Sequence, residues 1–202
     1  MNRPSFLAFP AIAAIALSSC SPAAETPERK NAATVEDPND TLASVLNGME
    51  STETISEAVK EVGLVSLMDG SGAYTLLAPT DAAFESLGER GERLMEDDQR
   101  PLLVGLLRAH ILPGLVTPEA IGAAIDQKGG AVEMTTLGGG TVAFSRADGV
   151  DENDNDDGTI IVSDQQTSSA RISGTAVAAS NGAVIPIDTV LATGAPPTTP
   201  AQ

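Results

Sequence analysis

The chain has 202 residues, of which 28 are acidic and 11 basic, so its formal net charge is −17 at pH 7. This balance excludes nucleic acid as a partner, because phosphate binding requires clustered lysine and arginine side chains. It is typical of a solvated acidic surface, and it also suits cation binding or a basic partner. A hydrophobic fraction of 42% is sufficient for one core, but aromatic residues make up 2% of the chain, so aliphatic side chains have to fill that core.

The chain contains one cysteine and one histidine, which limits its chemistry. A single cysteine forms no internal disulfide and no cysteine-rich metal site. Any Ser-His-Asp or Cys-His device would have to use His110, and the sequence contains no Gly-x-Ser-x-Gly, Walker or His-Glu-x-x-His motif. We therefore expect a protein that is not an enzyme and carries no cofactor, with calcium as the one candidate exception.

Residues 1–19 have the build of a secretory signal peptide, because Arg3 precedes an apolar run that ends in small residues and is too short to span a bilayer comfortably. The letters LSSC at residues 17–20 resemble a bacterial lipobox, after which Cys20 is lipidated, for example with palmitate, and becomes the first residue. A plain signal peptide with an incidental cysteine is the alternative. Because Ser21 follows the cysteine, we expect a lipid-anchored protein of the bacterial outer membrane that faces the periplasm or the exterior.

Residues 21–40 are rich in proline, alanine and charge and show no apolar period, so residues 20–40 are expected to be the lipidated cysteine and a flexible linker. The folded domain is expected to span residues 41–192. Residues 193–202 are expected to form a disordered tail.

The first half of the domain is predicted to be rich in helix, from capping residues that precede apolar residues at helical spacing. Residues 89–100 are expected to be a polar surface segment with one further turn. The predicted helices begin at Thr41, at Thr54 or Ser56, at Ala82, at Pro101 and at Thr117.

From residue 131 the pattern becomes strand-like, with short apolar or β-branched runs separated by Gly, Asn, Asp and Ser. A helix-rich first half and an antiparallel, strand-rich second half predict a single α+β domain. An earlier strand, residues 74–78, is expected to insert among the later ones. The predicted later strands are Ala131–Thr136, Thr141–Arg146, Thr159–Ser163, Ala170–Ile172, Thr175–Ala179 and Ala183–Ile187.

Three stretches carry recognisable motifs. In residues 74–84 a strand turns abruptly into a helix, since Pro79 ends strand pairing and Thr80 or Asp81 can cap the helix that follows. Residues 102–114 are predicted to form an apolar helix closed by Pro-Gly. Residues 179–191 contain a strand, a hairpin turn at Asn-Gly and a returning apolar strand.

Together the three stretches resemble the fasciclin-like domain family, whose pattern is APT(D/N)xAF, LxYHxxxG and NGxxHxID. The resemblance covers about residues 41–192 and implies an adhesive module that acts through protein or glycan contacts. The chain departs from the pattern at Ala109, where the family usually has Tyr, and at Ile185, where it often has His. The residues that match the motifs and are expected to serve the fold are Thr80, Asp81, Phe84, His110, Asn181, Gly182 and Asp188.

Three motif residues are also candidates for chemistry. His110 could be a general base, because the unperturbed pKa of histidine lies near neutrality. It stands at the end of an apolar helix without a nearby acid in the sequence, so we expect it to donate to a buried backbone carbonyl or polar side chain. Asp81 and Asp188 are expected to cap a helix and end a strand rather than to form a catalytic pair.

Residues 148–157 carry six carboxylates. From residue 153 the sequence partly matches a calcium-binding loop, whose ligands would be Asn153, Asn155, Asp157 and Asp164. The match departs at its first and last positions, and strands replace the flanking helices. A solvated hairpin loop is the alternative.

The sequence thus predicts a lipid-anchored module for adhesion or interaction at the cell envelope, whose partner is an envelope or extracellular protein or glycan. The membrane is contacted through the lipid anchor alone. The alternative is an extracytoplasmic protein that binds a small ligand or calcium.

Overall fold

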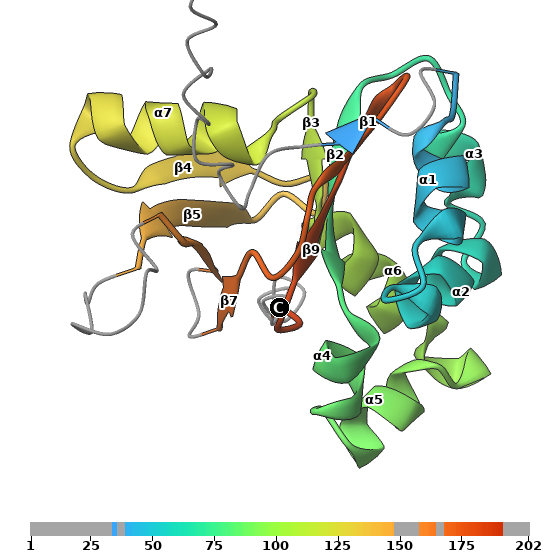
Figure 1. The fold of residues 1–202 in the computed structure, drawn as a ribbon. Helices are drawn as coiled ribbons and strands as arrows, with labels where there is room; N and C mark the ends of the chain where they lie inside the picture. The colour runs from blue at the N-terminus through green and yellow to red at the C-terminus, as the bar shows by residue number, and fades with distance from the viewer. Residues whose placement is uncertain (1–33, 36–38, 148–157, 165–167, 192–202) are drawn as a thin grey trace, which may run out of the picture.

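The computed structural model describes residues 34–35, 39–147, 158–164 and 168–191. They form two β-sheets with helices against them, and the prediction of a single α+β domain is confirmed. In Figure 1 the five-stranded sheet stands between the helices α1, α2 and α3 on one side and the four-stranded sheet with α7 on the other. The helices are α1 (Leu42–Gly48), α2 (Glu53–Glu61), α3 (Val65–Met68), α4 (Asp81–Glu85), α5 (Glu89–Leu94), η1 (Asp97–Gln99), α6 (Arg100–Ala109) and α7 (Pro118–Lys128).

The five-stranded sheet has the order β1-β8-β9-β2-β3, and the four-stranded sheet has the order β4-β5-β6-β7. The strand Tyr74–Pro79 pairs in parallel with Gly182–Ile187 along its whole length, from Tyr74 opposite Gly182 to Pro79 opposite Ile187. The expectation that residues 74–78 insert among the later strands is therefore confirmed. The strands are β1 (Thr34–Val35), β2 (Tyr74–Pro79), β3 (Ile111–Pro113), β4 (Val132–Thr135), β5 (Thr141–Arg146), β6 (Ile160–Asp164), β7 (Ser169–Arg171), β8 (Val177–Ala179) and β9 (Gly182–Ile187).

The central strands β2 and β9 supply side chains to two separate cores. Leu76 and Val184 belong to the core beneath the first helices. Leu77 and Ile185 belong to the core shared with α7 and the four-stranded sheet. Because successive strand residues point to opposite faces, a strand covered on both faces is apolar at every position. This is why Ile185, where the family often has His, is fully buried.

Three predictions of secondary structure were wrong. Ile111–Pro113 continues from α6 as an edge strand rather than as helix, since His110 ends that helix. Thr34–Val35 pairs in parallel with β8, although it falls in the expected linker. Residues 89–100, expected to contain one turn, form α5, η1 and the start of α6.

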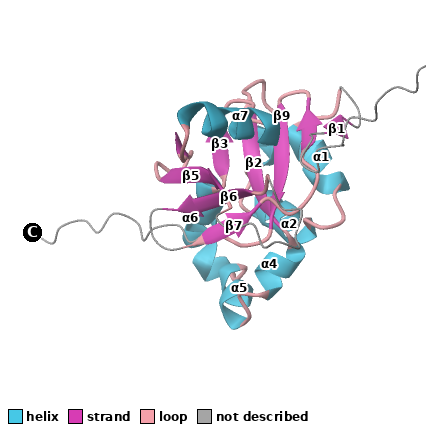
Figure 2. Ribbon diagram, turned by 60° about the vertical axis from the view of Figure 1, so that its left-hand side comes forward, coloured by secondary structure: helices cyan, strands magenta, loops and turns pink. Residues whose placement is uncertain are grey.

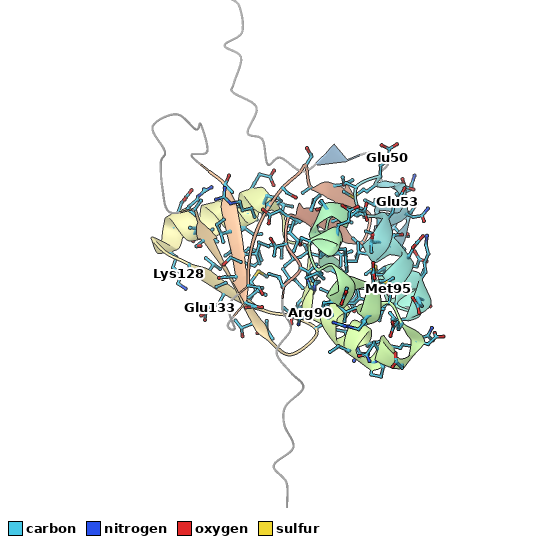
Figure 3. All side chains as sticks on the ribbon, turned by 90° about the horizontal axis from the view of Figure 1, so that it is seen from below. Glu50, Glu53, Arg90, Met95, Lys128 and Glu133 are labelled. Carbon is cyan, nitrogen blue, oxygen red and sulfur yellow. The ribbon has the colours of Figure 1, made fainter. Side chains whose placement is uncertain are left out.

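Charged side chains lie on the outside of the molecule. Glu50 and Glu53 project from the α1–α2 region, and Arg90 projects from α5 (Figure 3). Figure 2 shows α4 and α5 together at one end of the molecule, away from α7. No helix in the described part of the chain is long and apolar enough to cross a membrane.

Candidate functional site

His110, the residue that the sequence offers as a candidate general base, is completely buried at the C-terminal end of α6. Its Nδ1 lies 2.8 Å from the carbonyl oxygen of Leu106, and its Nε2 lies 3.1 Å from the backbone nitrogen of Leu191. A neutral imidazole protonated at Nδ1 satisfies both contacts, because Nδ1–H donates to the carbonyl and Nε2 accepts from the amide. Both ring nitrogens therefore have backbone partners, and the ring ties the end of the domain to α6.

Burial sets the protonation state of this ring. Burial lowers the pKa of His110 from 6.5 to about 4, although the Leu106 carbonyl and the negative charge of Asp164 act in the opposite direction. Removing the ring from water disfavours its charged form. His110 is neutral at pH 7, and it lies too deep to reach a substrate in solution.

Thr80 and Asp81 both cap helices, but different ones. The Thr80 hydroxyl accepts from the Ala83 amide and caps its own helix, α4. The Asp81 carboxylate accepts from the amides of Thr54 at 2.8 Å and Glu53 at 3.3 Å, which are the first amides of α2. Asp81 therefore joins the end of β2 to a helix that precedes it in the chain.

The pKa of Asp81 reflects this capping. Partial burial raises the pKa of the carboxyl, but hydrogen bonds from the side chain and amide of Thr54 and from the amide of Glu53 outweigh it. The net result is a pKa below its ordinary value of 3.8. Hydrogen bonds to the charged form stabilise that form, so the cap is ionised at neutral pH.

The side chain of Asn181 joins three segments. Its Oδ1 accepts from the Leu42 amide at the start of α1, at 2.8 Å. Its Nδ2 donates to the carbonyl oxygens of Met68 and Gly70, each at 2.7 Å, at the end of α3. An amide carries both acceptor and donors, so neither a carboxylate nor a hydroxyl could make all three bonds.

The Asn-Gly motif is placed one residue away from the expected turn. Ser180 and Asn181 form the turn between β8 and β9, while Gly182 is the first residue of β9 and pairs with Ala179. Glycine is required here by close approach, because a Cβ on Gly182 would lie 2.1 Å from the carbonyl oxygen of Tyr74. The hairpin prediction was right, but the reason for the glycine differs.

Asp188 links the two sheets. Its carboxylate accepts from the Arg171 amide at 2.7 Å, and its own amide donates to the Arg171 carbonyl. Beside this contact, Ile172, which follows β7, forms an isolated antiparallel bridge with Ile187, the last residue of β9. Asp81 and Asp188 thus follow two parallel neighbouring strands, but they bind different elements and do not form a carboxylate pair.

Ala109 lies under a tight turn. In the turn between β4 and β5, Gly138 N–H donates to the Arg108 carbonyl and Leu137 N–H donates to the Ile111 carbonyl. A Cβ on Gly138 would approach Ala109 within 3.1–3.3 Å. Where the family usually has Tyr, this chain therefore presents a small side chain packed against backbone.

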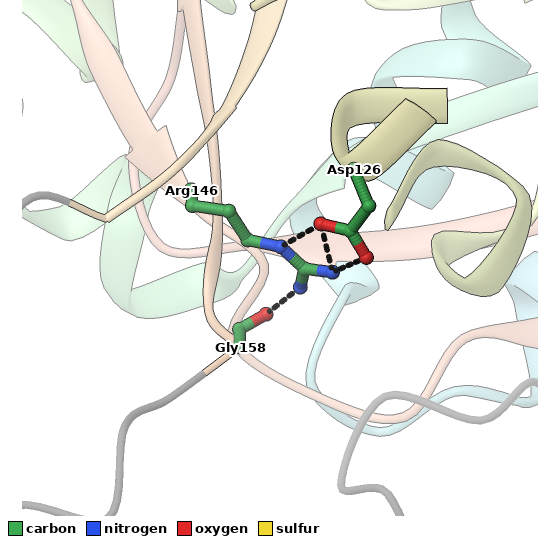
Figure 4. A network of polar contacts seen from close by, with 3 residues as sticks. All are labelled: Asp126, Arg146 and Gly158. Carbon is green, nitrogen blue, oxygen red and sulfur yellow. Dashed lines mark hydrogen bonds and ion pairs between the residues drawn. The ribbon is translucent and has the colours of Figure 1, made fainter. Parts of the chain in front are cut away.

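The contact between Asp126 and Arg146, which Figure 4 shows at close range, has no signal in the sequence. The guanidinium of Arg146 reaches both carboxylate oxygens of Asp126, the shorter contact being 3.0 Å, and donates to the Gly158 carbonyl at 2.8 Å. Gly122 leaves room for it, since a Cβ there would lie 3.0 Å from Nη2. The contact holds α7, β5 and the approach to β6 together.

Thr75 is a second residue that sequence reasoning missed. Its hydroxyl is buried, donates to the Gly114 carbonyl at 2.8 Å and accepts from the Val116 amide at 2.8 Å. A threonine among the apolar residues of a buried strand was the available signal, since a buried hydroxyl needs a partner. Phe84, by contrast, is buried in the core of the helical side, as expected of a motif residue.

Of the predicted calcium ligands, Asp164 lies within the described residues. Asp164 ends β6, opposite Val142, whereas the other end of that strand, Ile160, lies opposite Arg146. An extended strand of this length places Asp164 about 20 Å from Gly158, and the calcium assignment stays a prediction. Asn153, Asn155 and Asp157, like Cys20, lie outside the described residues.

No group of three or more potential metal ligands occurs within the ranges that the structure describes. The motif residues instead hold the scaffold, through hydrogen bonds from α1, α2 and α6 to the central sheet.

Comparisons with known proteins agree with this geometry. The family model described as Fasciclin domain matches residues 50–193. The chain is 34% identical to Protein sll1483 of Synechocystis sp. over 110 residues, which are 54% of this chain and 57% of that protein. It is 36% identical to transforming growth factor-beta-induced protein ig-h3 of Sus scrofa over 97 residues, which are 48% of this chain and 14% of that protein.

A solved structure shows the same fold. With a TM-score of 0.54 and 22% identity, the chain resembles a FAS1 domain pair from the insect cell adhesion molecule fasciclin I, covering 71% of this chain and 45% of that one. The chain spans less than two thirds of each of these three proteins. The matches confirm the resemblance inferred from the three motifs.

Proposed function

We propose, since the chain belongs to the fasciclin domain family, that it is a lipid-anchored module of the bacterial cell envelope that binds a protein or glycan through its surface. The domain is known in cell adhesion proteins, which supports an adhesion or interaction module in general terms. The observation that carries the proposal is the match over residues 50–193, whose motif residues are occupied in holding the scaffold.

The burial and hydrogen bonding of His110 favour a protein that binds a partner through its surface over an enzyme that uses this histidine. A general base must reach the proton that it removes, within hydrogen-bond distance or through one water. The imidazole is fully buried, and its two nitrogens contact Leu106 and Leu191. Because the chain contains one histidine, it has no accessible histidine that could act as a general acid or base at neutral pH.

The anchor is supported by the sequence alone. The single cysteine of the chain stands at the end of the lipobox-like letters LSSC, at Cys20. Two or more acyl chains hold a protein firmly on a membrane, because each buried methylene contributes about 0.8 kcal/mol. The domain would then stand outside the inner membrane, joined to the lipidated Cys20 by the residues that follow it.

Retention of envelope material by the domain tests the proposed contact. Residues 21–202 contain every described element, so this portion can be fixed to beads and incubated with envelope extracts. We expect saturable retention of a protein or glycan, competed by the same portion free in solution. Retention that does not saturate, or that free domain fails to compete, would contradict a specific contact.

Calcium binding by residues 148–157 is the second candidate function, favoured by their six carboxylates. Like charges crowded in one loop repel each other, and calcium accepts six to eight oxygen ligands without strict geometry. Millimolar calcium is expected to raise the melting temperature, and deletion of residues 150–157 to abolish the rise. Equal stabilisation by sodium at matched ionic strength would contradict it.

A further inference from the structure

The chain contains two Asn-Gly dipeptides, Asn47-Gly48 and Asn181-Gly182. Asparagine before glycine is the most reactive context for spontaneous deamidation, because glycine has no side chain to hinder its own backbone nitrogen. That nitrogen attacks Cγ of the asparagine, a N–Cγ bond forms, and Nδ2 leaves as ammonia. Water then opens the cyclic imide to aspartate or isoaspartate. In sequence terms the two sites are equivalent.

In the folded protein Asn181 is held away from this reaction. Three hydrogen bonds of 2.7–2.8 Å fix its amide to the backbone of Leu42, Met68 and Gly70. Its neighbour Gly182 is the first residue of β9, between β8 and β2. The reaction expels Nδ2, which donates two of these bonds, so it requires local opening of the structure around Asn181.

The product at position 181 would also be incompatible with the fold. A carboxylate has no hydrogen to donate, so it would face the Met68 and Gly70 carbonyls with oxygen against oxygen. The site is partly buried, and a lost donor there leaves acceptors unsatisfied. Deamidation of an opened molecule would therefore hinder its return to the native state.

Asn47 lies in the opposite environment. It is exposed in the last turn of the seven-residue helix α1, where helix ends open readily. Gly48 borders open space, since a Cβ added to it would have no neighbouring atom within 4 Å. The Asn47 Oδ1 accepts a hydrogen bond from Lys60 Nζ, so a carboxylate formed here would gain an ion pair with the same ammonium group.

We propose that Asn47 is a site of spontaneous deamidation in the folded protein, and that Asn181 becomes one only when the α1–α3 side opens from β9. The modification adds a negative charge next to Lys60 and leaves the fold intact. At Asn181 the same chemistry converts a reversible opening into an irreversible loss of structure. The two dipeptides therefore report, by their modification, whether a molecule has remained folded.

The wild-type protein supplies its own control, since both sites are in one chain. The purified full chain is incubated at pH 8, native or in denaturant, and the mass increase and isoaspartate at each site are followed by peptide mapping. We expect deamidation of Asn47 to be about tenfold or more faster than that of Asn181 in the native protein. In denaturant the two rates should agree within about threefold, because only local sequence remains.

Equal rates in the native protein, or faster reaction at Asn181, would overturn the proposal. The proposal would also be overturned if Asn47 reacted in denaturant but did not react in the native protein. The variants Asn47→Asp and Asn181→Asp give an independent measurement. The first is expected to keep the melting temperature of the wild type, and the second to lower it; the reverse order would also contradict the assignment.

Discussion

At the scale of single residues, the ring of His110 makes stability depend on pH. The unfolded chain takes up a proton on this histidine at its ordinary pKa of 6.5, whereas the folded chain does so at a pKa of about 4. Between these values the unfolded state binds more protons, so the free energy of unfolding falls as the pH falls from 6.5 to 4. The loss from this group is on the order of 3 kcal/mol across the window.

The variant His110→Gln tests this. Glutamine can accept from the Leu191 amide but does not titrate, so the variant should be less stable at pH 7 by about 1–3 kcal/mol. Its melting temperature should then fall less steeply than that of the wild type between pH 6.5 and 4. Carboxylates titrate equally in both proteins, which makes the wild type the control. Parallel pH profiles would show that the histidine is not buried neutral.

Gly182 permits a sharper test by substitution. Gly182→Ala places a methyl group 2.1 Å from the Tyr74 carbonyl oxygen, which forces β2 and β9 apart. We expect a loss of about 3 kcal/mol, as for severe overpacking. Gly48→Ala is the control, because nothing lies within 4 Å there, and alanine in α1 should change stability by no more than about 1 kcal/mol, in the stabilising direction. Chemical denaturation measures the free energy of unfolding of both variants. Equal changes in the two would contradict the close approach of Gly182 to the Tyr74 carbonyl oxygen.

The motif residues could be predicted from the sequence, but their partners could not. Asn181 and Gly182 were recognisable as a hairpin signal. That Asn181 binds the ends of α1 and α3, more than 100 residues earlier, depends on the tertiary fold. Hydrogen bonds between distant segments leave no periodic pattern, so a sequence reveals the donor and acceptor but not the pair.

At the scale of elements, the N-terminus of α2 depends on a residue outside that helix. Thr52 occupies the N-cap position without a side-chain cap bond, and Asp81 supplies the acceptor instead. Negative charge at a helix N-terminus is favourable because the amides there point outward with partial positive charge. Asp81 therefore couples α2 to the β2–α4 junction.

Asp81→Ala is expected to lower the free energy of unfolding by about 1–2 kcal/mol, the usual effect of losing a cap. Asp81→Asn should recover part of the loss, since asparagine keeps one acceptor. The pKa of Asp81 lies below 3.8 in the folded state, so its contribution is present above that pH and is lost as the pH falls through the lower value. Thermal denaturation at pH 7 is the measurement, and an unchanged melting temperature for Asp81→Ala would contradict the cap.

Helix starts were predictable because their signals are local. Thr41 and Thr117 accept from the third amide after them, as expected for capping residues. The edge strands β1 and β3 were missed, because each is short and owes its structure to the neighbouring strand. Pro113 in particular pairs opposite Tyr74 at the sheet edge, where a missing amide hydrogen costs little.

At the scale of the whole molecule, the proposed lipid anchor at Cys20 would determine where the domain is displayed. Cys20→Ser is expected to release the protein into soluble fractions or to stall its processing, because no acyl chain can be added. Fractionation and intact mass measure both outcomes. A variant that stays in the membrane at mature mass would show that another feature holds the protein there.

The apolar patterns predicted the α+β class, and the three motifs together indicated the fasciclin-like fold. Alternating patterns indicated strands in the second half, but the parallel pairing of β2 with β9 joins segments about a hundred residues apart. The alternation of apolar residues shows which face of a strand is buried, but it does not show which distant strand lies beside it. The contact between Asp126 and Arg146 could not be predicted from the sequence either, because Asp126 lies on α7 and Arg146 lies on β5.

The central claim is that the motif residues hold a scaffold and that its surface makes the functional contact. The most direct measurement is the affinity of wild-type and His110→Gln domains, residues 21–202, for retained envelope material, at a temperature at which both are folded. The account predicts saturable binding with the same affinity for both, although the variant melts earlier. Loss of binding in a variant whose fold and melting temperature are unchanged would contradict the account and make His110 a functional residue.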